Sequence, residues 1–385
     1  MTINPRTASQ DLPSLPSIRI PLPAKPRVKI PLVDSPIRGY MMYSYHLAVT
    51  FASVPAWPWF FGNFVQLQCD SRQLELGDFL KYSSMPKGEL HFTEGTSRFN
   101  PWLADAPGFD KQSFLGGYGS PSERVVERLE QGYCVETFVD EYYIPVLYNG
   151  GNLHFRHRLL VFDCQEEERR LHIAGFDKKS QYSRLICTFE EFDDAFASVQ
   201  PQQFEKTRLF KPRQDVFPAP GFDPLRLIHL LRDYLGGKNT LLSPDLHGSG
   251  QQGDSFRYGV DCYSFLAEFI QRIAVRRQAG EVLGVDFRGF HVLWEHKKCM
   301  LDRLKWLQRQ DYDLPDSLIA EYGRVQSLCE QARSRVVMCA RGLLPPDRGH
   351  LVEVPRYLEQ ARAAEVPILR RVLEILEAAS TSPAA

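Results

Sequence analysis

The pattern of apolar and polar positions changes after residue 222. Before it, short apolar runs rich in β-branched and aromatic residues are bounded by polar residues, glycine or proline, as is typical of strands. After it, apolar residues recur every three to four positions, as on one face of a helix. We therefore expect an α+β fold, with antiparallel strands in the first part and an all-helical second part of about five helices.

The clearest pair of strands lies within Leu153–Asp177. Its apolar run 159–162 is followed by a turn, 165–170, that is too charged to be buried without partners. The chain then returns through 171–176, so an antiparallel hairpin would place Asp177 near His157. A carboxylate beside an imidazole fixes its tautomer and stabilises the imidazolium, as the base of a nucleophile requires. The alternative is a surface hairpin with an ordinary histidine and aspartate.

Three further elements are predicted before position 200. The segment Gly39–Ala52 is apolar and aromatic throughout and predicts a buried helix, which Pro55 ends. Ser120 is the expected N-cap of a second helix that runs to Gln131. The β-branched and aromatic stretch Cys134–Pro145 predicts a strand beside the hairpin.

Prolines divide the chain into four parts. Residues 1–35 are punctuated by proline and predict an extended arm. Residues 201–222 combine prolines with polar residues and predict a linker. The two folded domains are therefore expected at 36–200 and 223–385.

Composition excludes several classes of protein. With 43% hydrophobic and 24% charged residues the chain is ordinary for a globular protein, and 46 basic against 47 acidic residues give no sign of binding to nucleic acid or a membrane surface. No run approaches the roughly 20 apolar residues of a transmembrane helix, and no secretory signal is visible. A cytoplasmic location is expected, where the 8 cysteines, none in a C-x-x-C pair, stay reduced.

No metal or cofactor is expected. His154 and His157 are three residues apart on a strand and so lie on opposite faces. His291 and His296 are five apart, off the i, i+4 spacing of a helical zinc pair. The glycine-rich stretch 116–119 does not match the spacing of a nucleotide-binding loop.

The order helix, glycine, strand, histidine strand, aspartate strand resembles the end of papain-like cysteine enzymes, and most of the chain resembles the butirosin biosynthesis protein H N-terminal family. The order of the two parts carries the resemblance more than any single motif. The similar segments are Glu130–Gly132, Val139–Tyr143, His154–His157, Gly175–Asp177 and Cys187–Phe192, with Asp286–His291 and Glu295–Lys298 in the second half.

The resemblance implies a papain-like N-terminal domain and an acyltransferase of a natural-product pathway. An acyl group would move from a thioester on the phosphopantetheine of an acyl or peptidyl carrier protein, through a covalent intermediate, to a small-molecule amine. His157 would be the base and Asp177 its orienting carboxylate. Asp140, Tyr143 and His154 would line the substrate cleft, although core packing is an equal interpretation for Tyr143. Lys297 and Lys298 could contact the carrier protein, or simply lie on a solvated helix face.

The chain departs from that family at the nucleophile. In the family a cysteine begins the N-terminal helix, whereas Gly39–Ala52 contains none and Met42 stands near the expected position. Ser44 is the candidate, because an adjacent base can activate a hydroxyl as it does a thiol, although serines often only cap helices. Cys69, on a predicted strand, would need a different geometry. The alternatives are a catalytically degenerate relative that binds a carrier-tethered intermediate or a partner enzyme, and a thioesterase or peptidase that uses the same cleft.

Overall fold

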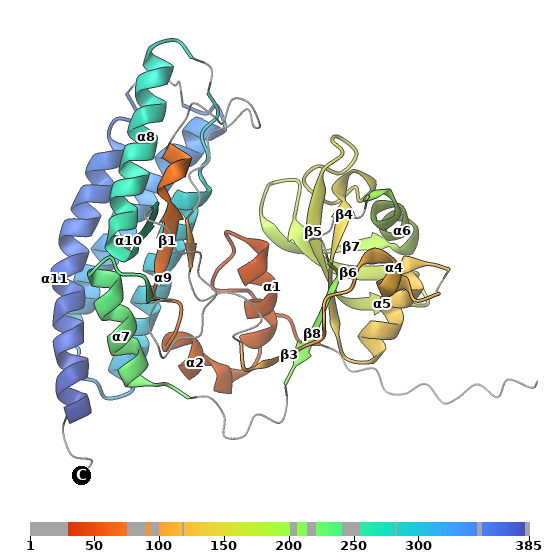
Figure 1. Ribbon diagram of the computed structural model, residues 1–385, viewed down its shortest axis with the longest axis horizontal. Helices are drawn as coiled ribbons and strands as arrows, with labels where there is room; N and C mark the ends of the chain where they lie inside the picture. The colour runs from red at the N-terminus through yellow and green to blue at the C-terminus, as the bar shows by residue number, and fades with distance from the viewer. Residues whose placement is uncertain are drawn as a thin grey trace, which may run out of the picture.

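The computed structural model describes residues 30–74, 90–92, 100–117, 119–200, 206–213, 221–240, 255–281, 283–344 and 349–381. These residues form a six-stranded sheet with helices on both faces, and a bundle of long helices that includes a three-stranded sheet (Figure 1). The coarse prediction is confirmed, since the fold mixes helices with antiparallel sheets and its C-terminal region is helical. The arm predicted at 1–35 lies mainly outside the described residues.

The larger sheet has the strand order β3-β8-β4-β5-β6-β7, and all its neighbours are antiparallel. Its strands are β3 (Leu103–Asp105), β4 (Cys134–Asp140), β5 (Arg156–Gln165), β6 (Arg170–Phe176), β7 (Tyr182–Thr188) and β8 (Arg208–Pro212). Strands β5 and β6 are the predicted hairpin. Strand β8 corrects the linker prediction, because Leu209 and Phe210 are both buried, one against each face of the sheet.

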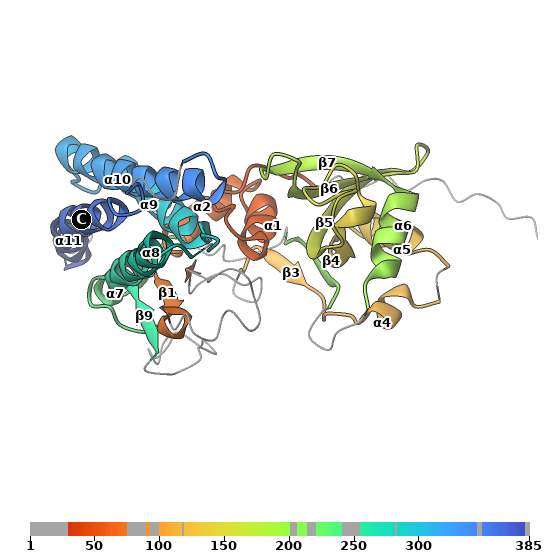
Figure 2. The same cartoon turned by 90° about the horizontal axis from the view of Figure 1, so that it is seen from above.

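Different helices cover the two faces of this sheet (Figure 2). On one face α4 (Lys111–Leu115), α5 (Pro121–Glu130) and α6 (Phe189–Ser198) pack on Leu159 and its neighbours. On the other face α1 (Met41–Thr50) packs on Leu160. Ser120 stands at the predicted N-cap of α5, but its hydroxyl donates to Asp193 Oδ2 at 2.6 Å rather than to the helix.

The helical region consists of α7 (Pro224–Leu235), α8 (Cys262–Gln278), α9 (Arg288–Arg309), α10 (Asp316–Ala340) and α11 (Val354–Thr381). Its core also contains segments from the first part of the chain: α2 (Trp57–Phe61) and the small sheet β2-β1-β9, formed by β1 (Leu67–Asp70), β2 (His91–Phe92) and β9 (Phe256–Tyr258). The predicted division at 200–223 is therefore corrected, because Phe60, Leu67 and Phe92 share one hydrophobic core with α7 to α11.

An ion pair lies in the centre of this bundle. Lys297 Nζ is 2.9 Å from each carboxylate oxygen of Glu365, and both side chains are 0% exposed. The hydroxyls of Tyr234, Tyr263 and Tyr322 also donate to this carboxylate. Burial, and then the adjacent carboxylate, raises the pKa of Tyr234 and Tyr322 well above the usual range. Lys297 is therefore a core residue and does not lie on the solvated face predicted for it. No helix in the described ranges is long and apolar enough to cross a membrane.

Candidate functional site

The connection between β4 and β5 begins where Asp140 ends β4. Its carboxylate accepts the Tyr142 backbone N–H at 3.1 Å and so caps the short helix η4 (Glu141–Tyr143), which is why the strand stops before the predicted Pro145. The same carboxylate accepts the backbone N–H of Phe155 at 3.0 Å and contacts His154 Nδ1 at 2.7 Å. Asp140 thereby ties the returning chain to the end of β4.

Glu141, the next residue, holds the second histidine. Its Oε1 is 2.7 Å from His157 Nδ1, and its Oε2 accepts from the Asn149 side chain at 2.7 Å. The Glu141 side chain is 3% exposed, whereas that of His157 is 34% exposed. Because Nδ1 donates to the carboxylate, Nε2 is the ring nitrogen left to accept a proton, and among the described residues it has no hydrogen-bond partner.

Aromatic rings surround both histidines. His154 stacks on Tyr142 at 4.1 Å between ring centroids and lies 5.7 Å from Tyr143. The His157 ring lies 5.2 Å from that of Phe155. We call His157 with Glu141 the His157 dyad and His154 with Asp140 the His154 dyad; both place a carboxylate on Nδ1.

The charge of Asp140 is stabilised in place. Partial burial raises the pKa of its carboxyl, but hydrogen bonds from His154 and from the backbone N–H groups of Tyr142 and Phe155 outweigh this effect, and the pKa lies below its usual range. Asp140 is therefore ionised at neutral pH. An ionised carboxylate keeps the proton of His154 on Nδ1.

Asp177, the predicted partner of His157, has another role. Its Oδ1 accepts the backbone N–H groups of Lys179 and Gln181 at 2.8 and 2.9 Å, and its Oδ2 accepts the Ser183 hydroxyl at 3.0 Å. These bonds order the turn between β6 and β7. Among the described residues His157 has no hydrogen bond to Asp177, and Glu141 occupies the position predicted for it.

Ser44 and His157 make no direct contact among the described residues. Ser44 belongs to α1, which packs on Leu160 of the sheet. The His157 ring lies 6.4 Å from that of Phe176, which packs against the same core as α1. The Ser44 side chain is buried, and its hydroxyl donates to the carbonyl of Tyr40 at 3.2 Å. The structure therefore does not bring Ser44 to His157.

Cysteine supplies no alternative nucleophile at this point. All 8 cysteines are buried, and Cys69 lies in the bundle region. In the described ranges, no hydroxyl or thiol hydrogen-bonds to His157. Of the predicted site residues, the structure brings together His157, His154, Asp140 and Tyr143, adds Glu141, and leaves out Ser44 and Asp177.

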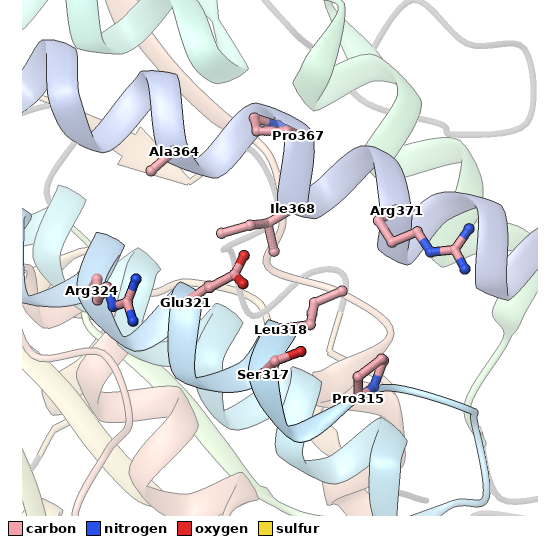
Figure 3. Close-up of a pocket in the computed structure, with 9 residues that line it drawn as sticks. All are labelled: Pro315, Ser317, Leu318, Glu321, Arg324, Ala364, Pro367, Ile368 and Arg371. Carbon is pink, nitrogen blue, oxygen red and sulfur yellow. The ribbon is translucent and has the colours of Figure 1, made fainter.

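A groove of about 470 Å³ lies elsewhere, between α10 and α11. Figure 3 shows Leu318, Glu321 and Ile368 pointing into the space between the two helices. The groove is at the opposite end of the molecule from β4 and β5, and no predicted site residue lines it (Figure 1). Helix α1 lies between the hairpin and α9, with residues in the core of the bundle and in the core of the six-stranded sheet. We therefore place the candidate site at the dyads, where two histidines contact carboxylates.

The fold and the site define the chain as an α+β protein with two carboxylate–histidine pairs at one end of an antiparallel sheet. In the described part of the chain there is no group of three or more His, Cys, Asp or Glu side chains that could hold a metal ion. Neither the models of known protein families nor the curated proteins match the chain.

Proposed function

We propose that the chain is an acyltransferase in which His157 acts as the general base. The observation that carries this proposal is the 2.7 Å contact between Glu141 and His157 Nδ1, combined with the partial exposure of the ring. A carboxylate on Nδ1 fixes the tautomer with a basic Nε2 and stabilises the imidazolium that forms. The remainder of the site supplies orientation, because the His154 dyad and its aromatic neighbours lie beside the base.

The acyl donor is a thioester on a carrier protein and the acceptor is a small amine, as the resemblance to the butirosin H family implies. Without a protein nucleophile at Nε2, transfer takes place in one displacement. The amine nitrogen bonds to the thioester carbon, the carbon–sulfur bond breaks, and the thiolate leaves the acyl group. His157 Nε2 takes the proton from the amine. This route replaces the predicted covalent intermediate on Ser44 and needs neither a metal nor a nucleotide.

The second candidate is a degenerate papain-like relative that binds a carrier-tethered intermediate or a partner enzyme. A helix packed on an antiparallel sheet supports the papain-like comparison, whereas the buried Ser44 and the absence of a cysteine in α1 favour loss of the nucleophile. The exposed rings of Tyr142 and Phe155 offer a contact surface for a partner. The third candidate is a thioesterase or peptidase, because the His157 side chain is 34% exposed and water can therefore reach it.

The test is turnover of acyl-pantetheine thioesters with a panel of amines, followed by mass spectrometry of the products. His157→Ala should lower the rate about 10²- to 10⁴-fold, the usual contribution of general base catalysis. Glu141→Gln should also lower the rate and shift its pH profile, because the imidazolium loses its carboxylate. Amide product would indicate transfer, and free acid would indicate hydrolysis.

His229→Ala is the matched control, because His229 pairs with Asp233 at 3.3 Å on the surface of α7. It should leave turnover unchanged. Equal turnover by the wild type and His157→Ala would contradict the catalytic proposal. A wild type that turns over no donor in the panel, but captures acyl carrier protein in a pull-down, would favour the binding function.

A further inference from the structure

Two cysteines far apart in the sequence meet inside the bundle region. Cys69 lies on β1 and Cys262 begins α8, and their Sγ atoms are 3.7 Å apart although 193 residues separate them. Their side chains are 2% and 0% exposed. Each thiol also approaches the carbonyl oxygen of Arg257, at 3.8 and 3.6 Å.

The backbone fixes this meeting. Cys69 pairs with Arg257 in the β1–β9 register, and the chain turns from β9 through η6 (Gly259–Asp261) into α8. Gly259 makes the turn possible, since its φ is +55° and a Cβ there would lie 2.0 Å from the Tyr234 carbonyl oxygen. The thiols are therefore held together by strand pairing and by a turn that only glycine fits.

We propose that Cys69 and Cys262 form a disulfide when a small-molecule disulfide such as oxidised glutathione reacts with the protein. One thiolate attacks the small disulfide and releases one glutathione thiolate. The other cysteine then attacks the mixed disulfide and releases the second. Two protein S–H bonds are lost, one S–S bond forms, and the two protons go to the two released thiolates. The sulfurs must close from 3.7 Å to about 2.0 Å.

Burial decides how fast this reaction runs. It raises the pKa of the Cys262 thiol well above its usual range, and the hydrogen bond between the two thiols raises it further, so the reactive thiolate is scarce in the closed structure. Reaction requires a local opening of β1 from β9. We expect slow oxidation that accelerates as the pH rises and in denaturant too dilute to unfold the protein.

The bond would connect two distant parts of the chain. It would join β1, from the first part of the sequence, to α8 of the bundle and close a long loop of chain. A closed loop restricts the unfolded chain, so the oxidised protein should melt roughly 5 °C or more above the reduced protein.

The experiment uses the full chain with oxidised glutathione, under native conditions and in dilute denaturant. Free thiols are counted, and a digest without reducing agent is analysed by mass spectrometry. The expected result is a fall from eight free thiols to six and one linked peptide that contains Cys69 and Cys262. Cys69→Ala and Cys262→Ala should each abolish that peptide. Cys134→Ala is the matched control and should retain it, because Cys134 is 0% exposed and, within the described ranges, has no hydrogen bond to a second thiol.

Three outcomes would overturn the proposal: eight thiols remaining under both conditions, other cysteine pairs linked as often as this one, or an oxidised protein that melts no higher than the reduced one. The linked peptide in the wild type decides the matter even where a variant fails to fold.

Discussion

The two regions of the molecule use a carboxylate and its nitrogen-bearing partner in opposite ways. In the bundle, Glu365 receives Lys297 and three tyrosine hydroxyls, and neither charged side chain is exposed. In the six-stranded sheet, the Glu141 side chain is also buried, at 3% exposed. Its partner His157 is one-third exposed, and the His157 Nε2 atom remains available to accept a proton. Burial of the carboxylate therefore does not distinguish a site from a core contact. What distinguishes them is whether the partner has an accessible atom left to react.

The comparison predicts its largest effect for Lys297→Met. The substitution leaves the Glu365 carboxylate buried beside three tyrosines without its counter-charge, and removing one partner of a buried ion pair typically costs about 3–5 kcal/mol. The free energy of unfolding, measured by urea denaturation, should fall by that amount. Adding Glu365→Gln should restore part of the loss, because the unpaired charge is then gone. A loss below about 1 kcal/mol for Lys297→Met would show that the cluster tolerates an unpaired carboxylate.

The sequence predicts the helix that carries this lysine better than it predicts the lysine's role. The apolar stripe of α9 includes Leu293, Met300 and Leu304, all buried. Lys297 falls on the same stripe, four residues after Leu293 and three before Met300, so the helical period places it in the core. A lysine in isolation suggests a solvated face. Its partner Glu365 is 68 residues away, and no local pattern connects the two.

The same limit applies to the candidate site. The hairpin β5–β6 follows from its apolar run and charged turn, and the structure has it. The partner of His157 could not be predicted, because it depends on the conformation of two turns. The Asp177 carboxylate forms hydrogen bonds within the turn after β6, and the short helix that Asp140 caps places Glu141 beside His157 instead. Strand β8 lies in a proline-rich stretch and has only two buried residues. Two residues are too few to show the alternation of apolar and polar positions that predicts a strand.

A middle-sized effect is expected for Asp140→Asn, and it depends on pH. Because the folded-state pKa of Asp140 is lowered, its charge stabilises the fold above the unfolded pKa of about 3.8, and this stabilisation is lost as the pH falls through the folded-state pKa. The variant should be less stable than the wild type at neutral pH by about 1 kcal/mol or less, since water screens the pair. Unfolding free energies measured from pH 7 to pH 2.5 should converge at the acidic end. If the difference in unfolding free energy between the two proteins stayed constant with pH, the substitution would act through altered packing and not through the lost charge.

The smallest effect is expected for Lys298→Ala, next to Lys297. Lys298 pairs with Asp302 at 3.3 Å, but the side chains are 47% and 44% exposed. A solvent-exposed i, i+4 pair contributes about 0.3–0.5 kcal/mol. The free energy of unfolding measured by urea denaturation should therefore be close to the wild-type value. A loss as large as that of Lys297→Met would contradict the distinction between the exposed and the buried lysine.

Helix α1 has a consequence for how the molecule comes apart. Nine of its ten residues are buried: Tyr43 and Leu47 belong to the core of the bundle, and Met41 and Tyr45 to the core of the six-stranded sheet. The boundary between the two regions therefore runs through a helix that both of them need, and not through a flexible connection. A calorimeter should record one cooperative melting transition for both, because neither region can lose its structure without stripping one side of α1.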